Sequence, residues 1–168
     1  MTTIAFDGKT LATDSLVTYD DMRAGTINKI ANVVGGVLAT AGNQEDGLLV
    51  VQWFNAGRKE TRPVLTSFVG LFIPNDGSAP QEFGEKLIPM AIPKFPWVAG
   101  TGKSFALAAM LAGKDAVEAV RIAIQLDIYS GGDVNCYEMD KQHHYSVATS
   151  LDLDSWARSA AAESGKIN

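Results

Sequence analysis

Thr2, which directly follows Met1, is the residue of this sequence whose type and position best suit catalysis. Methionine aminopeptidase in the cytosol removes an initial Met that precedes a small residue, so Thr2 would become the first residue. An N-terminal threonine carries its own base, because its α-amine, with a reference pKa of about 7.7–8, can accept the hydroxyl proton at neutral pH. The alternative interpretation is that Thr2 and Thr3 only begin an edge strand.

Asp14 and Lys29 could supply charges beside this nucleophile. A two-residue turn at Asp7-Gly8 predicts that Thr2 pairs with Thr13, the neighbour of Asp14. Lys29 lies on a β-like stretch between apolar side chains, and an ammonium near the N-terminus would lower the pKa of the nucleophile and hold its negative charge. That role requires a compensating carboxylate such as Asp14. A solvated lysine at a strand edge is the alternative.

Gly42 could supply a hydrogen-bond donor for an oxyanion. It follows the alternating run 36–41 and precedes a helix that Asn43 or Gln44 can begin, so its N–H could point into a cleft. An ordinary strand-to-helix turn is the alternative interpretation.

The elements that must position these residues are strand hairpins with helices inserted between them. Strands are predicted over 2–6, 10–14, 26–31, 33–41, 64–73, 97–99, 134–139 and 144–149, and helices from 43 or 44, over 104–112 and 115–128, and from 152 or 154 to about 165. Five of the six prolines lie within 74–96, which predicts a loop-rich insertion with at most edge strands. The order favours an antiparallel or mixed sheet covered by helices.

Length and composition predict a single domain over residues 1–168. The net charge of −5 argues against a general nucleic-acid binder, and the absence of an apolar run of about 18 residues argues against a membrane span. The first residues lack the pattern of a secretion signal. Cys136 is the single cysteine, and no Cys/His cluster has zinc spacing. We therefore expect a cytoplasmic protein with no cofactor and no bound metal.

Two further signals are weak. Gly102-Lys103-Ser104 has the position of a phosphate loop, but Trp97 stands where that pattern requires its first glycine. His143-His144 are neighbours on a predicted strand and point to opposite faces, so a shared metal is not expected.

The order of five segments resembles that of a known family: TTIAFDGKTLATDS, NKI, TAGNQED, GTGKSFALAAMLAG and AIQLDIYSGGDVNCYEM. In this order they resemble proteasome β subunits and the related bacterial peptidase HslV, over most of the chain outside about 55–96. The resemblance implies an α+β fold, the four-layer αββα sandwich of N-terminal nucleophile hydrolases, with two antiparallel sheets between helix layers. It also implies Thr2 as the nucleophile, Asp14 and Lys29 as the charged pair beside it, and the Gly42 amide as the oxyanion donor.

Three more site residues come from the resemblance alone. Thr101 stands where the family usually has a serine near the amine of the nucleophile, and Asp127 and Ser130 would orient the Thr2 amine and a water. Two departures from the family pattern are a shorter first hairpin and Thr13 in place of a glycine.

The expected activity is therefore that of a threonine endopeptidase in a self-compartmentalising ring. The resemblance implies peptide or unfolded-protein substrates, a homo-oligomeric ring and an ATPase unfoldase as a further partner. Two alternatives remain open. One is a catalytically inactive assembly protein with the same fold that retains Met1, and the other is a small-molecule amidase of the same superfamily, because the nucleophile does not fix the leaving group.

Overall fold

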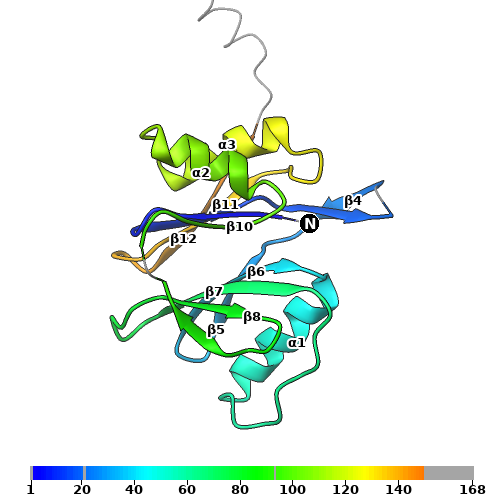
Figure 1. The fold of residues 1–168 in the computed structure, drawn as a ribbon, viewed down its shortest axis with the longest axis vertical. Coiled ribbons are helices and arrows are strands. Elements are labelled where there is room, and N and C mark those ends of the chain that lie inside the picture. Colours follow the sequence, from blue (N-terminus) through cyan, green and yellow to red (C-terminus); the bar gives the residue numbers. More distant parts are fainter. Residues whose placement is uncertain (1, 21, 93, 150–168) are drawn as a thin grey trace, which may run out of the picture.

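A computed structural model describes residues 2–20, 22–92 and 94–149, a mixed α+β chain (Figure 1). Its strands are β1 (Thr3–Phe6), β2 (Thr10–Thr13), β3 (Leu16–Tyr19), β4 (Met22–Thr26), β5 (Ile30–Val33), β6 (Gly36–Gly42), β7 (Phe68–Pro74), β8 (Gln81–Gly84), β9 (Pro89–Ala91), β10 (Trp97–Gly100), β11 (Val134–Glu138) and β12 (His143–Val147). Its helices are α1 (Gln44–Asn55), α2 (Lys103–Leu111) and α3 (Ala116–Leu126). The expected helix between about 152 and 165 lies outside the described residues.

The described strands form three antiparallel sheets rather than the two that we expected. The first has the order β10-β1-β2-β11-β12, the second the order β5-β6-β7-β8-β9, and β3 and β4 pair only with each other. Every residue of β4 is exposed, so this strand has no apolar face to bury against a larger sheet. Sequence patterning therefore missed it, and the number of sheets in the prediction was wrong.

Alternation of side chains along the strands produces three separate cores. Ile4 and Phe6 of β1 point toward the second sheet and pack with Leu71 and Ile73 of β7. Ala5, between them, points the other way, into the core that contains residues of α2 and α3. A third cluster joins the opposite face of the second sheet to α1. In Figure 1, α2 and α3 cover the first sheet, and α1 lies beyond the second.

Side chains at the predicted helix starts cap α1 and α3. The Asn43 side chain accepts a hydrogen bond from the Glu45 amide at 2.9 Å and begins α1. Asp115 accepts from the Glu118 amide at 2.8 Å and begins α3. The helix α3 ends at Leu126, just before Asp127. The Asp127 carboxylate therefore lies next to Thr101, which is bonded to Thr2 just before β1.

The loop of the first hairpin is longer than predicted. Phe6 pairs with Leu11, so four residues rather than two lie between the paired positions. The Asp7 carboxylate explains the extra length, because its Oδ1 accepts from the amides of Lys9 and Thr10 at 2.9 and 2.8 Å.

This longer loop shifts the strand register by two residues. Thr13 pairs with Ile4 instead of Thr2, and the Asp14 amide donates to the Thr3 carbonyl at 3.2 Å. Because side chains alternate with a period of two, an even shift leaves each one on its predicted face. The correction therefore places Asp14 opposite Thr3.

The proline-rich stretch contains more sheet than we predicted. β8 lies between β7 and β9, so it is not an edge strand. Pro80 precedes β8 and Pro89 begins the edge strand β9, so neither proline removes a donor from within β8. None of the helices in the described ranges is long and apolar enough to cross a membrane.

Candidate active site

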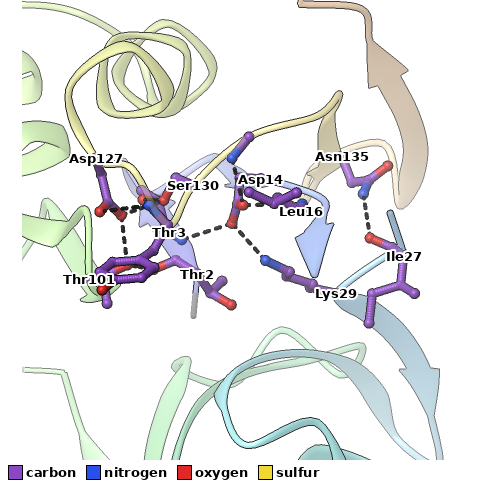
Figure 2. Close-up of polar contacts among 12 residues, drawn as sticks. Thr2, Thr3, Asp14, Leu16, Ile27, Lys29, Thr101, Asp127, Ser130 and Asn135 are labelled. Carbon is purple, nitrogen blue, oxygen red and sulfur yellow. Dashed lines mark hydrogen bonds and ion pairs between the residues drawn. The ribbon is translucent and has the colours of Figure 1, made fainter. Parts of the chain in front are cut away.

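The Asp14 carboxylate is held by four donors at the start of β1 (Figure 2). Its Oδ1 accepts from the Thr3 amide at 2.8 Å and from Lys29 Nζ at 2.9 Å. Its Oδ2 accepts from the amides of Gly131 at 3.0 Å and Leu16 at 3.2 Å. These bonds fix the carboxylate in one orientation directly after β2.

This ion pair is removed from solvent. Asp14 is 0% exposed, Lys29 7% and the neighbouring Thr2 3%. Burial raises the pKa of Asp14, against the opposing effects of the Lys29 ammonium and the amides of Thr3 and Gly131. Burial likewise lowers the pKa of Lys29, and the Asp14 carboxylate opposes that shift. Each partner therefore opposes the effect of burial on the pKa of the other.

The backbone of Lys29 belongs to the second sheet, although its side chain reaches the first. Its carbonyl accepts from the Thr40 amide of β6 at 3.1 Å. The Asn28 side chain accepts from the Ile30 amide at 2.9 Å, which fixes the chain just before β5. The bond from Lys29 to Asp14 therefore connects the two large sheets at the site.

A second polar group surrounds Asp127 on the other side of the Thr2–Thr3 segment (Figure 2). Asp127 Oδ2 accepts from the hydroxyls of Thr101 and Ser130, both at 2.6 Å. Because the Ser130 proton is directed to Asp127, the contact of 2.7 Å between the hydroxyls of Thr3 and Ser130 is donated by Thr3. The Thr101 amide donates to the Thr2 carbonyl at 2.7 Å. This group thus holds the backbone of Thr2 and the side chain of Thr3.

Two glycines let β10 and α2 approach this segment closely. Gly100 has φ +89°, and a Cβ there would overlap the Thr2 carbonyl oxygen. A Cβ on Gly102 would overlap the Thr3 hydroxyl and lie 3.2 Å from Asp127 Oδ2. Gly100 and Gly102 therefore have a packing role, which the weak phosphate-loop signal at Gly102-Lys103-Ser104 did not suggest.

Gly42 ends β6 with its N–H pointing away from β7. The Asn43 amide donates to the Ser67 carbonyl at 2.8 Å, so Gly42 and Phe68 form a non-hydrogen-bonded pair of the antiparallel ladder. Gly42 has φ +114°, and a Cβ there would overlap the Ser67 carbonyl oxygen. Only glycine fits this position.

The Gly42 N–H faces the side of β6 on which Lys29 lies. The Thr40 amide, two residues earlier, points to the same side and donates to the Lys29 carbonyl. β5 begins at Ile30, paired with Ala39, so no strand of the sheet lies beside Gly42 there. An exposed amide without a ladder partner can donate to a ligand.

The structure joins six of the seven predicted site residues, or their direct neighbours, into two linked groups. Asp14 and Lys29 form one group and Thr101, Asp127 and Ser130 the other, with Thr2 between them. Gly42 lies on the second sheet and makes no hydrogen bond to these residues within the described part of the chain.

Sequence reasoning missed Thr3, which contributes its amide to Asp14 and its hydroxyl to Ser130. Its position next to Thr2 was a usable signal, because adjacent residues of a strand face opposite sides. In the ranges that the structure describes, no group of three or more His, Cys, Asp or Glu side chains is arranged to hold a metal ion.

Comparisons with known proteins give no family for this chain. No protein-family model matches it, and a search of curated proteins finds no match. The functional interpretation therefore depends on the geometry above and on the motif resemblance.

Proposed function

We propose that this protein is a threonine peptidase whose nucleophile is the Thr2 hydroxyl and whose base is the Thr2 α-amine, which is freed when Met1 is removed. The observation that carries the proposal is the buried Asp14–Lys29 pair beside Thr2, in which one Asp14 oxygen binds both the Lys29 ammonium and the Thr3 amide. Burying an ion pair costs desolvation energy, so a buried pair that is retained points to a role in specificity or chemistry. Groups with strongly shifted pKa values are also typical of active sites.

The first step is attack of the Thr2 Oγ1 on the carbonyl carbon of a peptide bond. The hydroxyl proton passes to the Thr2 α-amine as the new C–O bond forms. The Lys29 ammonium stabilises the developing negative charge, and it acts strongly because the site excludes water. Asp14 keeps that ammonium protonated and oriented.

The tetrahedral oxyanion then requires a donor, and the Gly42 N–H is available for it. Collapse of this intermediate breaks the C–N bond, and the α-ammonium returns its proton to the leaving amine. The acyl group remains on Thr2 as an ester. A water molecule, deprotonated by the α-amine, hydrolyses the ester and restores the free hydroxyl.

The group around Asp127 orients the nucleophile. It holds the Thr2 carbonyl through the Thr101 amide and the Thr3 side chain through Ser130. The first bond restricts Thr2 directly and the second restricts its neighbour Thr3, which together favour a reactive geometry at Thr2. The resemblance further implies that Asp127 and Ser130 orient the Thr2 amine and a water.

The layer order supports the finer fold proposal, the αββα sandwich of N-terminal nucleophile hydrolases. α2 and α3, the two large sheets and α1 follow one another in that order, with a core between each pair of layers. The homo-oligomeric ring, the unfolded-protein substrate and the ATPase partner remain predictions from the resemblance. Native mass spectrometry of the purified protein tests the ring.

Intact mass and labelling test the peptidase proposal. Purified protein should lack the mass of one methionine, and an electrophile that captures hydroxyl and amine together should attach to Thr2. Thr2→Ala should abolish labelling and peptide hydrolysis, while Thr61→Ala, at an exposed threonine, should change neither. Full mass without activity would support the inactive assembly protein. Labelling with hydrolysis of simple amides but not peptides would support the amidase.

A further inference from the structure

Asp46, in the first turn of α1, organises the segment that presses against Gly42. The side chain is buried, with 5% of the residue exposed. Its Oδ2 accepts from the Thr66 amide at 2.7 Å, the Thr66 hydroxyl at 2.9 Å and the Ser67 amide at 2.7 Å. One carboxylate oxygen therefore determines where residues 66 and 67 lie.

These bonds replace a common arrangement at the start of a helix. An acidic residue at the third helical position usually bonds back to the amide of the N-cap residue. Asp46 occupies that position relative to Asn43, but its carboxylate turns to Thr66 and Ser67. The Ser67 carbonyl instead accepts from the Asn43 amide at 2.8 Å. The start of α1 thus depends on Ser67, and Ser67 depends on Asp46.

The same carbonyl controls the conformation of Gly42. The Ser67 oxygen occupies the space that a Cβ of Gly42 would fill, and Gly42 adopts φ +114° beside it. Moving Ser67 would release this contact and the bond to Asn43 together. The end of β6, which carries the candidate oxyanion donor, could then shift.

We infer that Asp46 is a positioning residue that sets the direction of the Gly42 N–H toward the oxyanion. This inference rests on the proposed function, and Asp46 itself contacts no reacting atom. Its effect should be specific to the tetrahedral state, because binding of a substrate in the ground state does not require the oxyanion donor. If Asp46 only stabilised the fold, its loss would weaken binding in the ground state and in the tetrahedral state equally.

A pair of ligands separates these possibilities. A peptide boronate forms a tetrahedral adduct with a nucleophilic hydroxyl and presents an oxygen where the oxyanion would lie, whereas the same peptide as a carboxamide binds without an adduct. Asp46→Ala should weaken boronate binding about tenfold and leave carboxamide binding within about twofold, as a displaced oxyanion donor predicts. kcat should fall with KM nearly unchanged.

Asp76→Ala is the matched control. Asp76 Oδ1 accepts from the Ser78 amide at 2.9 Å and from the Ser78 hydroxyl at 2.6 Å, within an exposed turn that follows β7 at the opposite end of that strand from Phe68. This control should leave both affinities unchanged. Equal weakening of the two ligands by Asp46→Ala, or the same selective loss in Asp76→Ala, would overturn the inference.

A second measurement tests the inference even if Asp46→Ala does not fold or the wild-type protein does not react with the boronate. In ¹⁵N NMR spectra of the whole chain, the conservative Asp46→Asn should move the Gly42 and Asn43 amide signals, and Asp76→Asn should not. An unmoved Gly42 signal contradicts the inference even if the enzyme is active. A third outcome separates the two proposals. If the Gly42 signal moves in Asp46→Asn but the wild-type protein never forms an adduct with the boronate, the positioning role of Asp46 is supported and the peptidase proposal is refuted.

Discussion

Lys29 and Thr3 share one acceptor atom, Asp14 Oδ1, at 2.9 and 2.8 Å. Thr3 belongs to the first sheet, and the backbone of Lys29 is bonded to the second. A single oxygen atom therefore connects the beginning of β1 to the strand that carries Gly42. The relative position of the two sheets sets the distance between Thr2 and Gly42, so packing of the core between the sheets affects the geometry of the proposed site.

Removing one partner of the buried pair should destabilise the protein strongly. Lys29→Met leaves Asp14 buried without its ammonium, and we expect the free energy of unfolding to fall by about 3–5 kcal/mol. The double variant Asp14→Asn/Lys29→Met should lose less, because it leaves no unpaired charge. Urea denaturation of the single and double variants checks both expectations.

The surface pair Lys141–Glu138 provides the control for this cycle. Its atoms are 2.8 Å apart, but the Lys141 side chain is 72% exposed, so Lys141→Met should change stability by less than about 1 kcal/mol. A double variant as unstable as Lys29→Met would contradict the view that an unpaired buried charge causes the loss.

The activity should have a pH profile with two limbs. kcat/KM should rise as the Thr2 α-amine loses its proton, near its reference pKa of about 7.7–8. It should fall when Lys29 loses its proton, at a pH below the ordinary lysine value of 10.5, because burial lowers the Lys29 pKa. Peptide hydrolysis measured across this range gives both limbs.

The variant Asp14→Asn tests how the Asp14 carboxylate affects the pKa of Lys29. The Asp14 carboxylate raises the Lys29 pKa against burial, so its removal should lower that pKa further. The falling limb should therefore move to lower pH in Asp14→Asn. A falling limb that stays in place, or moves to higher pH, would show that Lys29 does not cause it.

Gly100 should be intolerant of any side chain. Gly100→Ala would force a Cβ into the Thr2 carbonyl and displace Thr2, the proposed nucleophile, so the proposed activity should be lost. Gly113→Ala is the matched control, because Gly113 has nearly the same φ, +92°, with no atom within 4 Å of the added Cβ. The control should show only the backbone strain of about 1–2 kcal/mol in thermal unfolding, with activity retained. Equal inactivation by both changes would mean that strain, not the contact with Thr2, is responsible.

Local sequence signals predicted much of the scaffold. Asn43 and Asp115 are helix caps that act through bonds to residues two or three positions away, so the sequence around them is sufficient. The predicted strands 2–6 and 10–14 agree closely with β1 and β2, even though the predicted register was wrong by two residues. The register depended on Asp7, whose carboxylate lengthens a turn that its neighbour Gly8 suggested was tight.

The contacts that complete the candidate site are long-range, and local patterns do not contain them. Gly131 bonds to Asp14 across 117 positions, and Thr3 to Ser130 across 127. The motif resemblance named Ser130 and Asp127, but not Thr3 as their partner or Gly131 as a donor. The hairpin of β3 and β4 was missed because its second strand buries no face.

The hydrogen bond from the Thr3 hydroxyl to Ser130 should contribute to both stability and kcat. Thr3→Val keeps the shape of the side chain but leaves the fully buried Ser130 without this donor, so stability should fall by about 1–3 kcal/mol and kcat should decrease. Thr3→Ser should retain most of the stability and of kcat.

Thr13→Val is a stringent control on the adjacent strand, because the Thr13 hydroxyl is buried and has no hydrogen-bond partner among the described residues. Removing that hydroxyl should be neutral or stabilising, since an unsatisfied buried polar group is replaced by a methyl group. If Thr13→Val and Thr3→Val reduce stability and kcat equally, the loss reflects altered packing of the hairpin rather than the bond from Thr3 to Ser130.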